Sequence, residues 1–249
     1  MSAGEPAAGR PVLVLGGTAE ARALAAALHA DGVPVVSSLA GRVARPRLPV
    51  GEVRIGGFGG PDAMATWITD HGVRTVVDAT HPFAERISAS AARACAVAGV
   101  PRLRLERPGW APGRGDRWTW VPDLDAAARV LDDLAARRVF LTTGRQGLAA
   151  FADDADRWFL IRCVDPPEVA LPRHHELLLD RGPYTVTGEG SLMDAHRIDT
   201  VVTKDSGGPL TVAKLTVARE RGLPVIVVRR PPRPDGPTVT TVEEAVAWL

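Results

Sequence analysis

The sequence predicts a protein of the α/β class with two open, mainly parallel sheets. Short apolar runs rich in β-branched residues alternate along the chain with alanine-rich stretches. Each apolar run is bounded by Gly or Pro, which is typical of strands covered on both faces. Strands that alternate with helices form βαβ units and therefore parallel sheets. A chain of 249 residues, 45% of them hydrophobic, is large enough for two such domains.

The first half of the chain contains the first of these sheets. Strands are expected at residues 12–15, 33–36, 51–56, 75–78 and 102–105, and helices at 19–30, 61–71 and 84–98. Pro61 suits the first turn of the helix at 61–71, and Gly99 ends the helix at 84–98. The strand at 102–105 alternates charged and apolar residues, so we expect it at the edge of this sheet.

A segment rich in Pro and Gly, 108–116, separates this half from a second α/β set. Strands are expected there at 139–143, 158–164, 177–179, 200–203 and 224–228, and helices at 124–137, 191–197, 210–221 and the C-terminus. Thr241 and Glu244 have the spacing of a capping box at the start of the last helix. We therefore expect two Rossmann-like domains, a nucleotide-binding domain at 11–115 and a second domain at 116–249, with the active-site cleft between them.

Composition excludes several classes of function. The 30 basic and 29 acidic residues leave a net charge of +1, which gives no electrostatic case for binding nucleic acid or a membrane surface. Cys95 and Cys163 are far apart and are expected to be reduced core thiols, while the adjacent His174 and His175 have no third ligand at metal spacing. We expect no metal site. The start of the chain lacks the pattern of a signal peptide, so a cytoplasmic location is expected.

The first candidate site follows the first strand, because ligands of open parallel sheets bind at the carboxyl ends of the strands. Gly16 and Gly17 would let a phosphate approach the backbone, and Thr18 and Glu20 open a helix whose N-terminus attracts anions. This turn departs from the G-x-G-x-x-G fingerprint. Glycine-rich turns also occur for tight packing alone, so both readings stay open.

The end of the second strand bears on the choice of cofactor. An NAD-binding fold usually carries an acid about twenty residues after the glycines, to bind the ribose 2′-hydroxyl. This chain has Ser37, Ser38 and Arg42 there instead. Hydroxyls with an arginine suit a 2′-phosphate, which favours NADP; the alternative is a polar loop with a surface arginine.

The third candidate follows the fourth strand, in the sequence DATHPFA (78–84). Pro82 excludes His81 from the α region, so we expect His81 to lie at the strand end, facing the cleft. A histidine there could bind an anion, donate a proton or bond a carbonyl. It could equally cap the next helix.

The second half contains two further strand ends with hydroxyls, glycines and cations. They are TTGR, with Thr143, Gly144 and Arg145, and TKDSGG, with Lys204, Asp205, Ser206, Gly207 and Gly208. Both sets suit anionic ligands. Other families are disfavoured, because Tyr184 lacks the lysine of a Y-x-x-x-K pair and no G-x-S-x-G elbow or P-loop is present.

Taken in order and spacing, GGTAEAR (16–22), SSLAGR (37–42), DATHPFA (78–84), TTGR (142–145) and TKDSGG (203–208) resemble the precorrin-6A reductases of cobalamin biosynthesis. The resemblance extends from Val12 to about Arg230. The first ten residues and PRPDGP (232–237) look like unconstrained additions.

The resemblance implies NADPH-dependent reduction of one double bond of the precorrin-6A macrocycle, giving precorrin-6B. The expected cofactor residues are Gly16, Gly17, Thr18, Glu20, Ser37, Ser38, Arg42, Thr80, Thr143 and Gly144. The expected substrate residues are Arg145, Asp205, Ser206, Gly207 and Gly208, and His81 and Lys204 are the catalytic candidates, with water as the alternative proton source. The expected partners are the tetrapyrrole substrate and, transiently, neighbouring enzymes of the pathway.

Three other functions remain as alternatives. One is the closely similar reaction of the anaerobic route on a cobalt-containing substrate, which sequence inspection does not separate from the metal-free one. Another NADP-dependent small-molecule reductase is disfavoured by the missing Tyr/Lys pair. A protein that only senses NADP would not need the polar strand ends of the second half.

Overall fold

The computed structural model describes residues 9–41 and 47–249, and their contacts divide the chain into two compact units. Unit 1 comprises the residues up to Arg107 together with Pro232–Leu249, and unit 2 comprises Pro108–Pro231. Each unit contains a six-stranded sheet in which every pair of neighbouring strands is parallel. The expectation of two parallel-sheet α/β domains is therefore confirmed.

Unit 1 is a sheet in the order β12-β5-β4-β1-β2-β3, with two helices on each face. Its elements are β1 (Val12–Leu15), α1 (Ala19–Ala30), β2 (Val35–Leu39), β3 (Glu52–Ile55), α2 (Pro61–Asp70), β4 (Thr75–Asp78), α3 (Glu85–Ala98), β5 (Arg102–Leu105), β12 (Thr238–Val239) and α7 (Val242–Trp248). Helices α1 and α7 pack on one face of the sheet and α2 and α3 on the other. Both faces are covered because the central strands present apolar side chains to both of them.

Unit 2 has a sheet in the order β6-β11-β10-β7-β8-β9, whose edge strand β6 is the first strand of its unit, whereas β12 is the last strand of unit 1. Its elements are β6 (Arg117–Val121), α4 (Leu124–Asp133), β7 (Arg138–Thr142), the 3₁₀ helix η1 (Leu148–Phe151), β8 (Trp158–Cys163), β9 (His174–Leu179), α5 (Val186–Ala195), β10 (Thr200–Lys204), the 3₁₀ helix η2 (Pro209–Thr211), α6 (Ala213–Glu220) and β11 (Pro224–Val228). Residues of α5 and α6 pack with Phe140, Leu160 and Val201 in one buried cluster.

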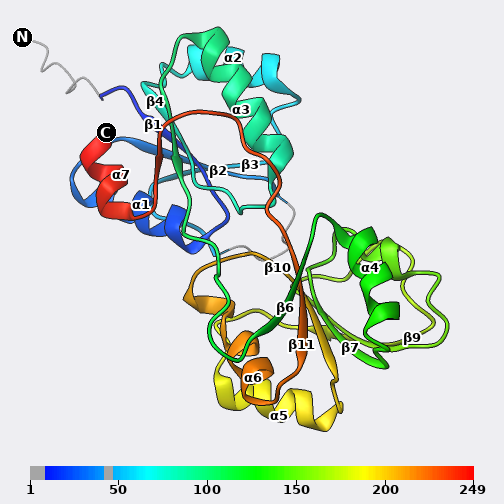
Figure 1. Cartoon of the computed structure of the whole chain (residues 1–249). Coiled ribbons are helices and arrows are strands. Elements are labelled where there is room, and N and C mark those ends of the chain that lie inside the picture. Colours follow the sequence, from blue (N-terminus) through cyan, green and yellow to red (C-terminus); the bar gives the residue numbers. More distant parts are fainter. Residues whose placement is uncertain (1–8, 42–46) are drawn as a thin grey trace, which may run out of the picture. The chain divides into compact units, whose positions relative to one another are not determined.

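The C-terminal segment corrects the expected domain boundaries of 11–115 and 116–249. Strand β12 pairs with β5, and α7, red in Figure 1, packs against α1, so the last residues belong to unit 1. Strand β5 is therefore not the edge strand that its alternating pattern suggested. The pairing was hidden from sequence inspection because β12 has two residues and lies more than a hundred residues after its partner.

The two units share the topological feature that positions ligands in doubly wound folds. In each sheet the chain turns outward in opposite directions from two central strands, β1 and β4 in unit 1 and β7 and β10 in unit 2. Beyond the carboxyl ends of such a pair, the crossover connections diverge and leave room for a ligand. Gly17, His81, Gly144 and Lys204, four of the candidate residues, lie at these two places. None of the helices in the described part of the chain is both long and apolar enough to span a membrane.

Candidate active site

The turn from β1 into α1 forms an open cradle in unit 1. Gly17 has a φ of +111°, and a Cβ added there would meet nothing within 4 Å. The glycine is thus required by the backbone conformation, and the space beside it is empty. The turn opens a small hollow lined by Gly16, Gly17, Ala21, Arg22, Ser37, Leu39, Arg47 and Pro49. Gly16, Gly17 and Ser37, expected to share a site, are therefore brought together.

The side chains of Thr18 and Glu20 are already occupied by the protein. The Thr18 hydroxyl accepts from the Ala21 N–H at 3.1 Å as the N-cap of α1, and donates to the Ala79 carbonyl at 2.7 Å. Glu20 forms an ion pair with Arg107 at 2.8 Å. These contacts fix the start of α1 next to the end of β4, so Thr18 and Glu20 shape the cradle through the backbone.

Ser37 and Ser38 lie inside β2, since the strand extends to Leu39 and not to residue 36. Both are buried, and their side chains point to opposite faces of the sheet. Ser37 Oγ, which borders the hollow, has no hydrogen-bond partner among residues 9–41 and 47–249. A buried hydroxyl without a partner is costly unless a ligand or water bonds it. Arg42 lies outside the described residues.

Arg54 is a cation at the end of β2 that sequence inspection missed. From the neighbouring strand β3 it donates to Ser38 Oγ at 3.3 Å and to the carbonyls of Gly56 and Gly57 at 2.6 and 2.7 Å. Its guanidinium lies 3.7 Å from the centre of the Phe58 ring. These partners are neutral, and burial lowers the pKa of Arg54. The register Ser38↔Arg54, which only the sheet supplies, makes the pair visible.

The loop after β4 holds His81 in one orientation. The Phe83 N–H donates to His81 Nδ1 at 3.2 Å, which makes Nδ1 an acceptor and leaves Nε2 as the N–H of the neutral ring. Thr80 is buried, and its hydroxyl donates to Asp78 at 2.6 Å. Thr80 therefore supports the loop from within, while half-buried His81 offers a donor at the carboxyl end of β4.

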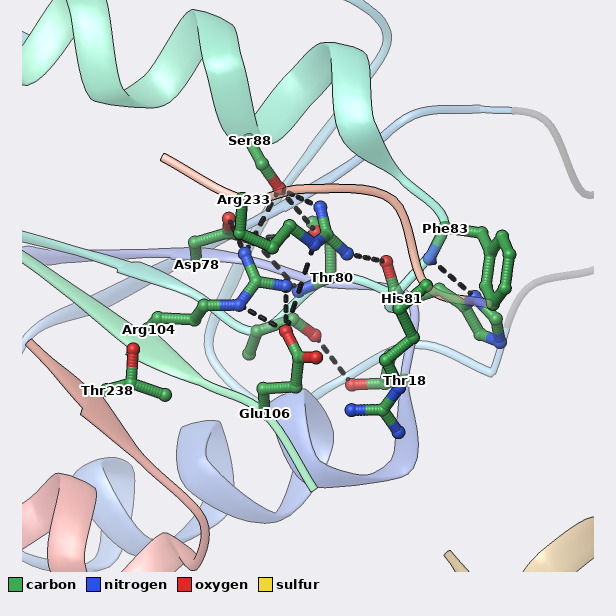
Figure 2. A network of polar contacts seen from close by, with 12 residues as sticks. Thr18, Asp78, Thr80, His81, Phe83, Ser88, Arg104, Glu106, Arg233 and Thr238 are labelled. Atoms are coloured by element: carbon green, nitrogen blue, oxygen red, sulfur yellow. Dashed lines mark hydrogen bonds and ion pairs between the residues drawn. The ribbon is translucent and has the colours of Figure 1, made fainter. Parts of the chain in front are cut away.

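A buried network of charges lies beside this loop (Figure 2). Asp78 is fully buried and accepts from Arg104 Nη1 at 3.0 Å; Arg104 in turn pairs with Glu106. Arg233 donates to Ser88 Oγ at 2.8 Å and to the His81 carbonyl at 2.9 Å. The segment 232–237 is thus not an unconstrained addition. Its contacts escaped sequence inspection because they join residues 145 and 152 positions apart.

In unit 2, the end of β7 resembles the cradle of unit 1. Gly144 has a φ of +72°, and a Cβ there would meet nothing within 4 Å. Thr143 is buried, and its Oγ1 has no hydrogen-bond partner in the described part of the chain. Arg145 follows directly in the sequence. Thr143, Gly144 and Arg145 thus lie at the switch point of unit 2, and not in the unit that contains Gly16.

Lys204 is the last residue of β10, the neighbour of β7. Its Nζ donates to the Gln146 carbonyl at 3.4 Å, which places it beside the TTGR loop. Burial lowers the pKa of Lys204, and a small opposing effect comes from Cys163. Cys163 ends β8, and its thiol pKa is raised by burial against the positive charges of Arg145 and Lys204. Lys204, Arg145 and Cys163 therefore meet at one edge of the sheet.

Asp205 and the glycines after it hold the start of unit 2 in place. The Asp205 carboxylate accepts from the Trp110 N–H at 2.9 Å and pairs with Arg230 at 3.2 Å. A Cβ on Gly207, whose φ is +64°, would lie 2.2 Å from the Pro108 carbonyl oxygen. Gly208 O accepts from the Trp110 indole at 3.0 Å. Asp205, Gly207 and Gly208 were expected to bind substrate. In the structure their contacts are with other residues of unit 2, which gives each of them a structural role.

Lys214 is a buried lysine in unit 2, near the start of α6. It is 3% exposed, donates to the Thr211 carbonyl at 2.6 Å and lies 4.8 Å from the centre of the Trp110 ring. Burial and the nearby Arg162 lower its pKa to about 7, while Glu189 opposes the shift. Arg162 itself pairs with Glu189, with 3.0 Å between Arg162 Nη2 and Glu189 Oε2. No group of three metal-ligating side chains occurs among the residues that the structure describes.

Comparison with known proteins gives one consistent result. Residues 11–249 match the family described as precorrin-6x reductase CbiJ/CobK. The chain is 56% identical over 240 residues to a precorrin-6A reductase of Rhodococcus erythropolis, covering 96% of each chain. It is 31% identical to a cobalt-precorrin-6A reductase of Priestia megaterium, covering 96% of this chain and 97% of the relative. A solved structure, "CobK precorrin-6A reductase", superposes with a TM-score of 0.90 at 44% identity, covering 96% and 95% of the two chains.

Proposed function

The chain belongs to the precorrin-6x reductase family, oxidoreductases that act on a CH–CH bond in cobalamin biosynthesis, and on this premise we propose that it reduces precorrin-6A to precorrin-6B with NADPH. The metal-free substrate is supported by the greater similarity to the precorrin-6A reductase than to the cobalt-precorrin-6A reductase. Family membership over almost the whole chain is the observation that carries the proposal.

NADPH would bind to unit 1. The cradle at Gly17 and the first N–H groups of α1 suit the pyrophosphate, because a helix N-terminus attracts anions. Ser37 Oγ, buried beside the hollow without a partner among the described residues, suits a bond to the ribose. The residues present therefore fit the cofactor. When bound, NADPH supplies the hydride.

The 2′-phosphate would be bound near the end of β2. The expected residues are Ser37, Ser38 and Arg42, and Arg54 adds a half-buried guanidinium whose described contacts are neutral. A phosphate gains charge-assisted hydrogen bonds from such a group. The absence of an acid at Ser37 and Ser38 supports NADPH over NADH.

His81 would bind substrate or cofactor and leave the proton transfer to another group. Its Nδ1 accepts from Phe83, so in the neutral ring Nε2 carries the proton and would donate to an acceptor oxygen such as a carboxylate of the macrocycle. Protonating Nδ1 would break the bond to Phe83. Giving up the Nε2 proton would instead leave an imidazolate, which is unfavourable near neutral pH.

Lys204 would donate the proton. Reduction of the double bond adds the hydride to one carbon and a proton to its neighbour, and an ammonium with a lowered pKa is the better donor. Burial provides that shift at Lys204. Thr143, Gly144, Arg145 and Ser206 would bind carboxylates of the macrocycle at the same edge of unit 2, through hydroxyl, backbone and guanidinium donors.

The test is direct. Purified protein is mixed with NADPH and precorrin-6A, and the nicotinamide absorbance band is followed together with the mass of the tetrapyrrole. We expect NADPH oxidation to match the gain of two hydrogens by the substrate. Cobalt-precorrin-6A and NADH serve as the matched alternatives. No turnover of precorrin-6A with either cofactor would refute the proposal.

A further inference from the structure

The segment that returns the chain to unit 1, beginning at Pro232, contacts the loop after β4 at its most polar point. Arg233 has a side chain that is 13% exposed and donates two hydrogen bonds, from Nη1 to Ser88 Oγ and from Nη2 to the His81 carbonyl. Ser88 is a fully buried residue in α3. One planar guanidinium therefore joins the loop to the helix that follows it (Figure 2).

The charges around Arg233 are arranged so that this side chain stays in place. Glu106 lies with its carboxylate 3.9 Å from Arg233 Nε and also pairs with Arg104. Arg104 is paired with Asp78, which ends β4. In the described part of unit 1, Arg104 and Arg233 thus lie next to the carboxylates of Asp78 and Glu106. Buried ion pairs of this kind add little net stability and are better explained by the specific geometry that they impose.

The geometry imposed here concerns His81. Its backbone is held from one side by Arg233 and its ring from the other by the Phe83 N–H. With both restraints the Nε2–H keeps a single direction at the carboxyl end of β4. Without Arg233, the His81 carbonyl and the Ser88 hydroxyl would each lose a donor, and the loop could rotate.

From these contacts we propose that Arg233 is a positioning residue for His81, so that the C-terminal segment helps to build the binding edge of unit 1. The inference rests on the proposed function, in which His81 binds substrate or cofactor. Arg233 acts through the loop and touches no reactant. Its effect must therefore disappear when the His81 side chain is removed.

A double-mutant cycle tests this dependence with the full-length enzyme: wild type, R233Q, H81A and H81A/R233Q. We expect each single variant to raise the KM for precorrin-6A or the Kd for NADPH about ten-fold, the scale of one lost hydrogen bond, with kcat nearly unchanged. The double variant should match H81A within about two-fold. R93Q, which breaks the exposed Arg93–Asp62 pair on the same unit, is the control and should match wild type.

The outcomes separate the two levels of the argument. If H81A raises KM or Kd and R233Q does not, the positioning role is refuted while the role of His81 stands. If R233Q has the same effect with and without the His81 ring, Arg233 acts independently and the inference is again wrong. If H81A has wild-type kinetics and cofactor affinity, the proposed role of His81 fails and the inference fails with it.

A second measurement does not depend on turnover. In protein labelled with ¹⁵N-histidine, the His81 ring should show one tautomer, with Nε2 protonated, and R233Q should shift it towards a mixture of tautomers. An unchanged ring spectrum in a folded R233Q protein would contradict the proposal. Should R233Q fail to fold, R233K keeps the charge beside Glu106, but its ammonium lacks the fork that spans both acceptors, so the same shift is expected.

Discussion

At the residue scale, two buried hydroxyls and two lysines, one buried and one half-buried, distinguish the carboxyl ends of the central strands from an ordinary protein interior. Most buried polar groups are satisfied by the protein itself. Ser37 Oγ and Thr143 Oγ1 lack such partners in the described residues. Both residues are among the cofactor residues expected from the sequence. Burial lowers the pKa of both Lys204 and Lys214, and lysines are seldom buried inside a protein. Function at these positions can be tested one side chain at a time.

Lys204 is tested by two replacements with different charge. K204A should lower kcat by about 10²–10⁴-fold, the range for loss of a general acid. K204R should be nearly as slow, because arginine retains its proton. The donor must be protonated, and burial lowers the pKa of Lys204, so wild-type kcat should fall as the pH rises through a value below 10.5. If K204R keeps wild-type kcat, Lys204 serves only as a positive charge.

Ser37 is tested by removing its hydroxyl. S37A should weaken NADPH by about three- to ten-fold and leave the Tm of the free protein unchanged or higher, because the hydroxyl has no described protein partner. S88A is the matched control: that buried hydroxyl bonds Arg233 and lies near Arg104, so its loss should lower the Tm. Equal NADPH binding by wild type and S37A would exclude Ser37 from the cofactor site.

Arg54 is tested by the choice between cofactors. R54Q should weaken NADPH by roughly ten- to a hundred-fold, the value of one or two charge-assisted bonds, and NADH much less. The ratio of the two dissociation constants is the readout, since damage to the Gly56–Gly57 loop would affect both cofactors alike. A ratio unchanged by R54Q would assign Arg54 to the loop alone, and R42Q is then the next variant to measure.

At the element scale, local signals determined where most helices begin. Thr18, Asp123, Thr185 and Thr241 each cap a helix through the side chain, and the capping box at Thr241 and Glu244 is confirmed. Helix α5 begins at Val186 and not at the expected residue 191. The prediction was wrong because Gly188 and Gly190 obscure the helical pattern of the first half of the helix. Strand β9 begins three residues before the expected 177, since its polar first half is exposed at the sheet edge.

Lys214, near the start of α6, should make the free energy of unfolding depend on pH. The pKa of Lys214 is about 7 when folded and ordinarily 10.5, so the charged form is disfavoured in the fold. This destabilisation is complete below pH 7 and is relieved as the pH rises towards 10.5. The wild-type free energy of unfolding should therefore increase between about pH 6 and pH 9, and the increase should be smaller in K214M. Parallel pH profiles for both proteins would show that Lys214 does not titrate in this range.

At the scale of the whole molecule, unit 1 completes its sheet with a strand from outside its main sequence block, whereas unit 2 is one continuous segment. Strand β6 follows the segment at 108–116 and pairs with β11, and β12 comes from the C-terminal end and pairs with β5. The last residues therefore stabilise a unit whose other strands were made more than a hundred positions earlier. Cores of this kind are built from non-local contacts, which sequence patterns do not report.

Deletion of residues 232–249 should affect the two units differently. It removes β12 from β5 and uncovers the cluster that Ala245, Val242 and Val246 complete on α1. Hydrogen exchange should accelerate in β1, β4 and β5, while β7, β8 and β10 keep their protection and serve as the internal control. Unchanged protection in β5 would mean that the C-terminal end adds nothing to the stability of unit 1.

The sequence by itself determined the α/β class, the central strands and helices, the cradle at Gly16 and Gly17 and the strand-end positions of His81 and Lys204. Those features depend on periodicity, turn residues and caps, which act over a few neighbouring positions. Only the tertiary structure decided that Arg54 lies beside Ser38, that Asp205 is held by Trp110 and Arg230, and that Arg233 bonds the His81 loop. Such contacts depend on strand register and on pairing between distant segments. The apolar pattern of a sequence predicts which strand is buried, but it does not specify which polar side chain from a distant segment will lie beside that strand.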